Sequence, residues 1–434
     1  MISTDLNVLD QLYLHLDRED EPWSVHLEVA VEGDIDEERL RDAVLSGMRA
    51  HPIARARLRR ALPTDVHYHW DIAEAVDEAS LDVVACEDDI ALGAARERLM
   101  SHSPSLESAP PFALTLAHHP EGDVVMLNLA HAAGDGMSAV RLMASFLRAY
   151  AGEEDPSPEV DPLEVRDIAR LVHSRSLKAR LARGATLVEQ AGRLGESPAR
   201  IAPQGESDRR GYGFVLLELN REDLETVRSH RRDGATVNDV LLAGLGVAIR
   251  RWNDRHGGAV GPLAVMMPVN LRPTEWRNEV VGNFASYVSV RFTPRDLVDL
   301  TAAVSAARAR TRDIKRHDSA GLVVDLLELP TATLPTAVKR RFQDLITLTG
   351  NRLVDSAVLS NLGRLDGVPR LGGSAGEVRR VWFSPPGRMP LGASLGAATY
   401  GDELFVCLRY RHALFDTDGA AAFASVLHGV LANP

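Results

Sequence analysis

Residues 124–130 form an almost continuously apolar run that is predicted to be a strand, and a helical period follows directly. In the first part, alternation places the apolar odd-numbered residues on the same face as His131, so the imidazole is predicted on the buried face at the end of a strand. Over 137–150 the apolar positions recur with the spacing of an amphipathic helix. The pattern predicts a strand that delivers a histidine to a glycine-bearing turn, which a helix follows.

The rest of the N-terminal part alternates short strand and helix patterns. Asp36 is predicted to cap one of the helices. The acidic stretch 77–89 shows no regular pattern. The predicted elements are a helix at 9–16, a half-exposed strand at 24–32, a helix at 37–50, a strand at 66–70, a helix at 90–101, and a hairpin made of 112–117 and the strand from residue 124.

The C-terminal part repeats this alternation after a basic helical pattern at 163–194 and a break at 198–213. Residues 263–269 are almost continuously apolar, which is typical of a strand buried on both faces. Thr236 is predicted to cap a helix. Strands are predicted at 214–219, 263–269, 287–292, 358–362, 378–383, 393–400 and 404–410, and helices at 221–231, 237–252, 296–316, 336–350 and 415–431.

Alternating strands and helices with hairpins among them favour the α/β class, built as two sandwich lobes with mixed sheets. The predicted division is an N-terminal lobe over 1–160, a helical crossover or linker over 161–205, and a C-terminal lobe over 206–434. A length of 434 residues fits two or three domains, or one large unit with two lobes.

Composition limits the class of protein and its expected location but does not identify a function. Hydrophobic residues at 45% and charged residues at 25% are typical of a soluble globular protein. The net charge of −12 argues against general binding of nucleic acid, which needs clustered positive charge. Cys86 and Cys407 match no metal-ligand spacing, and no metal site is predicted. The sequence shows no signal-peptide pattern and no transmembrane segment, so we expect a cytoplasmic protein. Peripheral contact with lipid stays an open alternative.

His131, Asp135 and Gly136 are the candidate chemical residues in the turn. An imidazole with its pKa near 6.5 suits general base catalysis on a hydroxyl or amine. Asp135 stands where a helix N-cap is expected, and Gly136 where a side chain would crowd the helix start or the substrate. The alternative interpretation is that His131 is a core histidine with its hydrogen bonds satisfied and that Asp135 is only a helix N-cap.

The motif H-x-x-x-D-G after an apolar strand resembles the active-site motif of acyltransferases related to chloramphenicol acetyltransferase and to peptide-synthetase condensation domains. Further segments occur in the order seen in the wax ester synthase/diacylglycerol acyltransferase branch of that superfamily, which the chain resembles most. These segments are 9–14, 25–29, 51–52, 110–112, 237–241, 268–273, 282–283 and 359–361. The resemblance covers nearly the whole chain.

The resemblance implies two chloramphenicol acetyltransferase-like lobes that form a V, with a central tunnel and the motif histidine at its middle. It also implies acyl transfer from a thioester, either acyl-CoA or an acyl carrier protein's phosphopantetheine, to a small alcohol or amine, with no bound cofactor. Because a thiol has a pKa of about 8.5, the thiolate leaves readily and no covalent acyl-enzyme is required. His131 would then be the general base.

Other residues receive supporting roles from the same resemblance. Asp135 is similar to a structural carboxylate that pairs with an arginine, for which Arg272 is the candidate. Asn270 and Asn238 are candidate oxyanion donors, although a buried amide more often fixes a loop. The candidate substrate contacts are Pro111, Phe112, Ser360 and Asn361.

The sequence departs from the family pattern in two places. Ala130 stands where many members carry a second histidine, and because it points to the opposite face its loss should not remove the base. Residues 384–388 replace the D-F-G-W-G of the peptide-synthetase type, which favours an ester-forming enzyme with a hydroxyl acceptor. Two alternatives stay open. One is a standalone condensation-like enzyme that forms amides or esters from carrier-bound intermediates in a biosynthetic pathway. The other is a catalytically silent binding or scaffolding protein with this fold.

Overall fold

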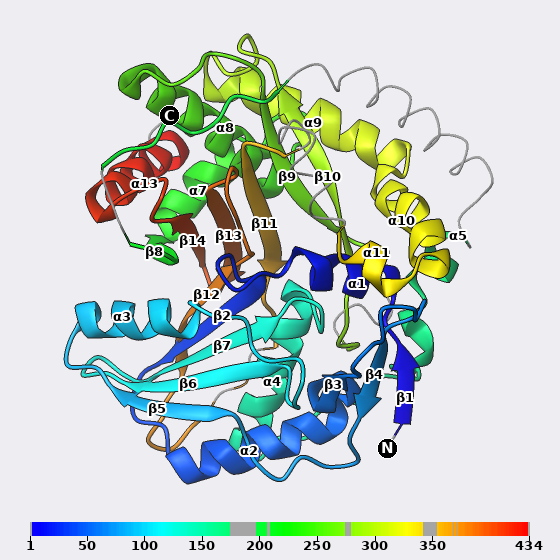
Figure 1. Ribbon diagram of the computed structural model, residues 1–434. Helices are drawn as coiled ribbons and strands as arrows, with labels where there is room; N and C mark the ends of the chain where they lie inside the picture. The colour runs from blue at the N-terminus through cyan, green and yellow to red at the C-terminus, as the bar shows by residue number, and fades with distance from the viewer. Residues whose placement is uncertain are drawn as a thin grey trace.

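The computed structural model describes residues 2–173, 197–205, 209–273, 279–341, 354–367, 369 and 371–432. These residues form two α/β lobes, each built around a mixed sheet (Figure 1). The predicted fold class is confirmed.

The N-terminal lobe contains a sheet of the order β12(Val378–Ser384), β2(Ser24–Val31), β7(Val124–Ala130), β6(Phe112–His118) and β5(Leu81–Ala85). β5 and β6 run parallel, and the other neighbours are antiparallel. Helices α2(Glu37–Ala50) and α4(Gly136–Ala151) pack on one face, and α3(Asp89–Leu99) packs on the other. A small sheet beside them has the order β1(Ile2–Asp5), β4(His69–Ile72) and β3(Ala56–Leu58).

The sheet of the C-terminal lobe has the order β10(Ala285–Phe292), β9(Leu263–Asn270), β11(Ala357–Arg364), β13(Ala393–Tyr400), β14(Glu403–Arg411) and β8(Tyr212–Leu219). β11 runs parallel to β9 and β13, and the remaining pairs are antiparallel. The main helices of this lobe are α7(Arg221–Ser229), α8(Val237–His256), α9(Leu300–Arg316) and α13(Thr417–Ala432). Shorter helices are α1(Val8–Leu16), α5(Ile168–His173), α10(Leu322–Thr333) and α11(Thr336–Lys339).

One strand from the C-terminal part of the chain belongs to the N-terminal sheet. β12 pairs with β2 over Phe383↔Leu27 and neighbouring positions, although the sequence division assigned it to the lobe of residues 206–434. It crosses close to β13, where a Cβ on Gly396 would stand 1.9 Å from the carbonyl oxygen of Phe383. Glycine at residue 396 therefore lets the two sheets meet. The exact lobe boundaries remain a prediction.

Two segments differ from the sequence prediction for identifiable reasons. The strand β2 is buried on both faces, not half exposed, because Glu28 accepts two hydrogen bonds from Arg96 of α3 at 2.6 and 2.7 Å and His26 lies beside it. β5 lies within the acidic stretch 77–89, where no strand was predicted, since its polar outer positions mask the alternation. Most of the predicted helix 163–194 and of the predicted helix 336–350 lies outside the described residues.

The predicted helix caps are confirmed. Asp36 and Asp135 accept hydrogen bonds from the backbone N–H three residues later, at 2.8 and 3.0 Å. Thr236 does the same for Asp239 at 3.2 Å. These bonds satisfy donors that a helix start leaves free.

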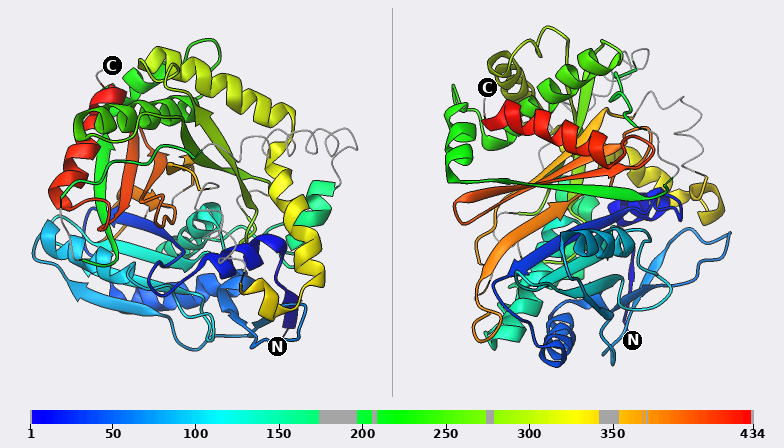
Figure 2. Two further views of the ribbon diagram at one scale, coloured as in Figure 1. Left: turned by 45° about the horizontal axis from the view of Figure 1, so that its top comes forward. Right: turned by 90° about the vertical axis from the view of Figure 1, so that its left-hand side faces the viewer.

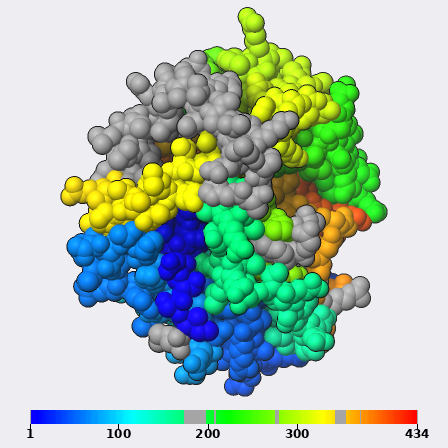
Figure 3. Space-filling view, turned by 90° about the vertical axis from the view of Figure 1, so that its right-hand side faces the viewer, coloured from blue at the N-terminus to red at the C-terminus, as the bar shows by residue number. Residues whose placement is uncertain are grey.

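Helices α10 and α11 reach from the C-terminal lobe to the N-terminal lobe (Figure 2). Figure 3 shows this segment, in yellow, against the first part of the chain, in blue. Lys339 ties the two together, because its ammonium donates to the Gln11 side chain at 3.0 Å and to the Val66 carbonyl at 2.6 Å. Within the described part of the chain, no helix has the length and apolar character needed to cross a bilayer.

Candidate active site

A cavity of about 1280 Å³ lies between the lobes, and both lobes supply its walls. α1 and the turn between β7 and α4 contribute one wall, whereas β9, β10, β11 and the α9–α10 region contribute the others. His131, Asp135 and Gly136 all line it. The predicted strand, turn and helix therefore deliver the imidazole to a large internal space.

His131 follows the last residue of β7, and its backbone N–H donates to the Trp23 carbonyl at 3.2 Å. The residue is only 9% exposed. Its Nδ1 is fully buried and has no hydrogen-bond partner in the described structure, whereas Nε2 is open to the cavity. The imidazole therefore has one nitrogen available for a ligand.

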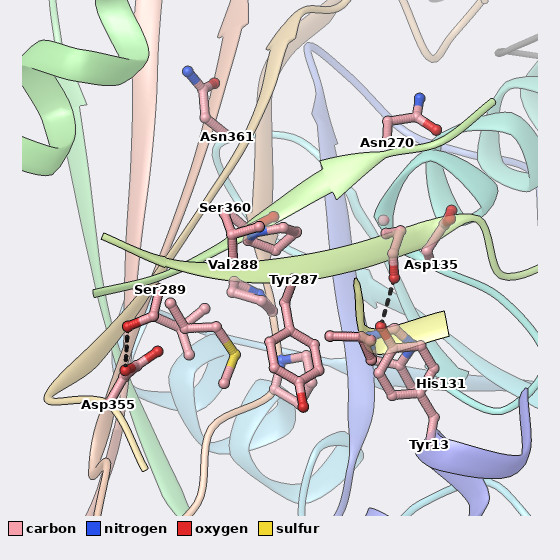
Figure 4. A pocket seen from close by; sticks show the side chains of 18 of the residues that line it. Tyr13, His131, Asp135, Asn270, Tyr287, Val288, Ser289, Asp355, Ser360 and Asn361 are labelled. Atoms are coloured by element: carbon pink, nitrogen blue, oxygen red, sulfur yellow. Dashed lines mark hydrogen bonds between the residues drawn. The ribbon is translucent and has the colours of Figure 1, made fainter. Parts of the chain in front are cut away.

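Tyr13 of α1 holds the imidazole plane. The two rings are stacked, with centroids 3.8 Å apart and planes 26° from parallel. The Tyr13 hydroxyl donates to the Ala285 carbonyl of β10 at 2.7 Å, so the phenol is itself anchored to the other lobe (Figure 4). Sequence reasoning placed Tyr13 only within the predicted helix 9–16, because stacking across 117 intervening positions leaves no local signal.

The surroundings keep His131 neutral. Burial lowers the pKa of the imidazole below 6.5, and this effect outweighs the nearby charge of Asp135, which acts in the opposite direction. At neutral pH the ring is therefore in the form that accepts a proton.

Asp135 forms the predicted ion pair with Arg272, which comes from the loop after β9. The guanidinium contacts the carboxylate through two nitrogens, at 2.7 and 2.9 Å, and both side chains are almost fully buried. This bidentate geometry is the strong form of an arginine–carboxylate contact. The pair joins the N-terminus of α4 to the C-terminal lobe.

Further hydrogen bonds complete the surroundings of Asp135. The backbone N–H of Phe284 donates to it at 3.0 Å, and Ser138 contributes both its backbone and its hydroxyl. Burial alone would raise the pKa of Asp135, but Arg272 and these donors lower it below its usual value. A carboxylate held in the charged form in this way does not transfer protons at neutral pH.

Asn283 fixes the backbone of the catalytic turn. Its side-chain nitrogen donates to the carbonyl oxygens of His131 and Ala132, at 2.7 and 3.0 Å. The same nitrogen lies 3.0 Å from Asp10, which also forms a buried ion pair with Arg166. Gly282-Asn283 stood out in the sequence only as part of the family resemblance, and its role in holding the turn was not predicted.

Gly136 is needed for steric reasons at this point. A Cβ there would stand 2.9 Å from the side chains of Leu362 and Phe383. A side chain would therefore be crowded here by β11 and β12, not by the helix start or the substrate that the sequence analysis named.

The remaining predicted residues divide into two groups. Asn270, Ser360 and Asn361 line the cavity, as expected of substrate contacts or an oxyanion donor. Asn270 also accepts a hydrogen bond from the Arg272 backbone at 3.0 Å, so it helps to shape the loop.

Asn238, Pro111 and Phe112 are not among the described residues that line the cavity, and this corrects the expectation that they face substrate. The Asn238 amide donates to the Met267 sulfur at 3.0 Å. Phe112 is buried against Phe146 of α4, with ring centroids 5.6 Å apart. Pro111 accepts a backbone hydrogen bond from Ala130 at 3.1 Å, which fixes the strand end instead.

Two buried charged residues on the cavity wall were missed. Asp355 precedes β11, and Arg388 lies in the loop that replaces the D-F-G-W-G segment. Neither side chain forms an ion pair in the described structure, and Nη1 of Arg388 is buried without a hydrogen-bond partner. An isolated charged residue in a sequence carries no sign of being buried, so neither was predicted.

Replacing Asp355 by asparagine should change how stability depends on pH. Burial raises the pKa of Asp355 from 3.8 to about 6, so the folded state binds a proton more tightly than the unfolded state. Stability is then highest below pH 3.8 for this group and falls as pH rises to about 6, by roughly 2–3 kcal/mol in total. Denaturant unfolding at a series of pH values should show this loss in the native protein and not in Asp355→Asn. Identical pH profiles would contradict the assignment.

No cluster of three or more histidine, cysteine or acidic residues suited to a metal ion occurs in the described ranges.

Comparisons with known proteins agree on one family. The family model "Condensation domain" matches residues 11–331. An uncharacterized protein of Mycobacterium tuberculosis strain H37Rv is 36% identical over 433 residues, 98% of each chain. Malformin synthetase of Aspergillus niger is 31% identical over 134 residues, which are 31% of this chain and 3% of that much longer protein.

Solved structures share the fold at low sequence identity. The first condensation domain of the CDA synthetase superposes with a TM-score of 0.70 and 14% identity, covering 100% of this chain and 97% of that one. The starter condensation domain of rhizomide synthetase RzmA, solved as a double mutant with C8-CoA and Leu-SNAC, gives a TM-score of 0.67 and 14% identity over 99% and 95% of the chains.

Proposed function

The chain belongs to the condensation-domain family of acyl- and amide-forming transferases, and on that premise we propose that it moves an acyl group from a thioester to an acceptor hydroxyl, with His131 as the general base. The observation that carries this proposal is a neutral imidazole whose Nε2 opens into a cavity walled by both lobes. Such a space accommodates a donor and an acceptor that meet at one base.

The reaction requires one residue that accepts a proton and then returns it. His131 takes the acceptor's hydroxyl proton on Nε2 while the oxygen attacks the thioester carbonyl. The carbon–sulfur bond then breaks, and the proton passes to the departing thiolate. Because the thiolate is a good leaving group, no acyl-enzyme is invoked.

Charge that develops on the carbonyl oxygen requires a hydrogen-bond donor. Asn270 remains a candidate, since it lines the same cavity as His131. Asn238 is dropped from this role because its amide bonds the Met267 sulfur. Asp135 and Arg272 are assigned a positioning role only, because their charges neutralise each other.

Acyl-CoA is the proposed donor, and a carrier-bound thioester is the second candidate. The resemblance to the ester-forming branch and the loss of D-F-G-W-G support the first. The C8-CoA in the RzmA domain structure shows that a condensation-domain fold has been solved with a CoA thioester. The similarity to part of malformin synthetase favours the second, in which amides or esters form from carrier-bound intermediates.

A panel experiment separates these functions. The protein is incubated with acyl-CoAs or acylated carrier proteins together with alcohols or amines, and free thiol and product are measured. Ester formation from acyl-CoA supports the proposal. Product from the carrier protein alone supports the second candidate, and ligand binding without turnover on any donor supports a silent binding protein.

The rate should depend on pH as the deprotonation of His131 requires. Because burial lowers the pKa of this residue, kcat/KM should rise with pH and reach half its plateau below pH 6.5. Initial rates of thiol release over a pH series measure this midpoint. A midpoint above 6.5 would show that the base is another group, or that the imidazole is protonated in the free enzyme.

A further inference from the structure

Asp355 presents a carboxylate oxygen to the cavity without an ionic partner. The residue is 6% exposed and stands two positions before the start of β11. The Ser289 hydroxyl of β10 donates to its Oδ1 at 2.7 Å, as Figure 4 shows. No hydrogen bond to its Oδ2 occurs among the described residues, and Asp355 is one of the residues that line the cavity.

The charged residues near Asp355 do not neutralise it by contact. Arg200 donates to the backbone carbonyl oxygens of Val354 and Asp355, at 2.9 and 2.6 Å, and not to the carboxylate. Arg291, which follows Ser289 on the cavity face of β10, lowers the pKa of Asp355 through space but forms no ion pair with it. Burial dominates, and the pKa is raised to about 6.

A buried carboxylate without a partner costs free energy in the folded protein. Such a group within a cavity indicates a site whose partner is a ligand. An ammonium group fits this position best, because it supplies both the missing charge and hydrogen-bond donors for Oδ2.

The strand register gives the distance along β10 between the subsite and Ala285. Ala285, whose carbonyl anchors the Tyr13 ring that stacks on His131, lies four residues before Ser289 on β10. At the usual rise of a strand, four residues span about 13 Å. The wall between these points is mainly apolar, since Met266, Pro268 and Tyr287 line it.

We propose that Asp355 and Ser289 form a subsite for an ammonium group at the far end of a substrate, with a mainly apolar wall about 13 Å long between the subsite and the residue that anchors the ring on His131. The inference rests on the proposed function only in calling the ligand a substrate. The subsite itself binds amines whether or not the protein turns them over.

Binding measurements test the subsite without any catalytic assay. Isothermal titration calorimetry is run with n-decylamine, n-decanol and n-decanoate below their micelle-forming concentrations, at a pH above the Asp355 pKa. The variants are Asp355→Asn and the matched control Asp313→Asn, which removes the same charge from an exposed position on the cavity wall. Circular dichroism confirms that both variants fold.

The native protein should bind n-decylamine at least about tenfold more tightly than n-decanol, the usual size of a charge-assisted hydrogen bond. Asp355→Asn should lose this preference, and Asp313→Asn should keep it. Ser289→Ala, which removes the hydrogen bond that positions the carboxylate, should weaken the preference for the amine without abolishing it. If Asp355→Asn does not fold, the native protein is also measured at pH 5, where the Asp355 carboxyl is largely protonated and the preference should shrink. The proposal is overturned if the native protein and Asp355→Asn have the same ratio of n-decylamine affinity to n-decanol affinity. It is also overturned if the native protein binds n-decanoate more tightly than n-decylamine.

Failure of the subsite is distinguishable from failure of the proposed function. If the protein prefers the amine but releases no thiol from any donor, the subsite is supported and the acyltransferase function is rejected. If thiol release depends on His131 but the protein shows no preference for the amine, the function is supported and the subsite is rejected.

Discussion

Replacement of His131 by alanine should lower the rate of acyl transfer by about 10²–10⁴, the usual contribution of a general base. The loss is expected in kcat and in kcat/KM, because the imidazole takes the proton only as the transition state forms. Free thiol and product, measured with the best donor and acceptor of the panel, give both constants.

The fold should survive this substitution, because the buried Nδ1 of the imidazole has no hydrogen-bond partner in the described structure. The ring does stack on Tyr13, so a modest loss of stability is expected. His67→Ala, at an exposed position, is the matched control and should retain full activity. A His131→Ala variant that is folded and turns over at the native rate would exclude this residue as the base.

Replacement of Arg272 by alanine should lower the free energy of unfolding by about 3–5 kcal/mol, because the Asp135 carboxylate is then left buried without its counter-charge. The guanidinium also donates to the carbonyl oxygens of Val280 and Gly282, and those bonds are lost as well. Urea unfolding of the native and variant proteins measures the difference.

Two variants show whether the loss comes from burial of the pair. Arg316→Ala removes an exposed ion pair to Asp313 and should change stability by no more than about 1 kcal/mol. Adding Asp135→Asn to Arg272→Ala removes the stranded charge and should recover part of the loss. If Arg272→Ala and Arg316→Ala prove equally mild, the pair does not hold the lobes together.

The strand, turn and helix around His131 were predictable because all three are local features. Alternation gives the face of the strand, the spacing of apolar residues gives the helix, and Asp135 occupies an N-cap position. The pairing of Asp135 with Arg272 was predictable only through the family resemblance, since 136 residues separate them in the sequence.

The contacts that complete the site depend on packing that has no local pattern. Tyr13 and Asp355 line the cavity from distant parts of the chain, Asn283 holds the turn from a third, and no local pattern predicts these contacts. The passage of β12 into the N-terminal sheet was missed for the same reason, because a strand's alternation does not tell which sheet it joins. Phe112 was assigned to substrate from the motif beside it, whereas its ring packs on α4.

The central claim is that His131 activates the acceptor for direct attack on the thioester. A single-turnover experiment with excess protein and an acyl thioester, followed by thiol release and by the intact mass of the protein with and without acceptor, tests it most directly. We predict that thiol is released only when acceptor is present, that release requires His131, and that the protein mass does not change. Thiol release without acceptor, together with a gain in protein mass equal to the acyl group, would contradict the account.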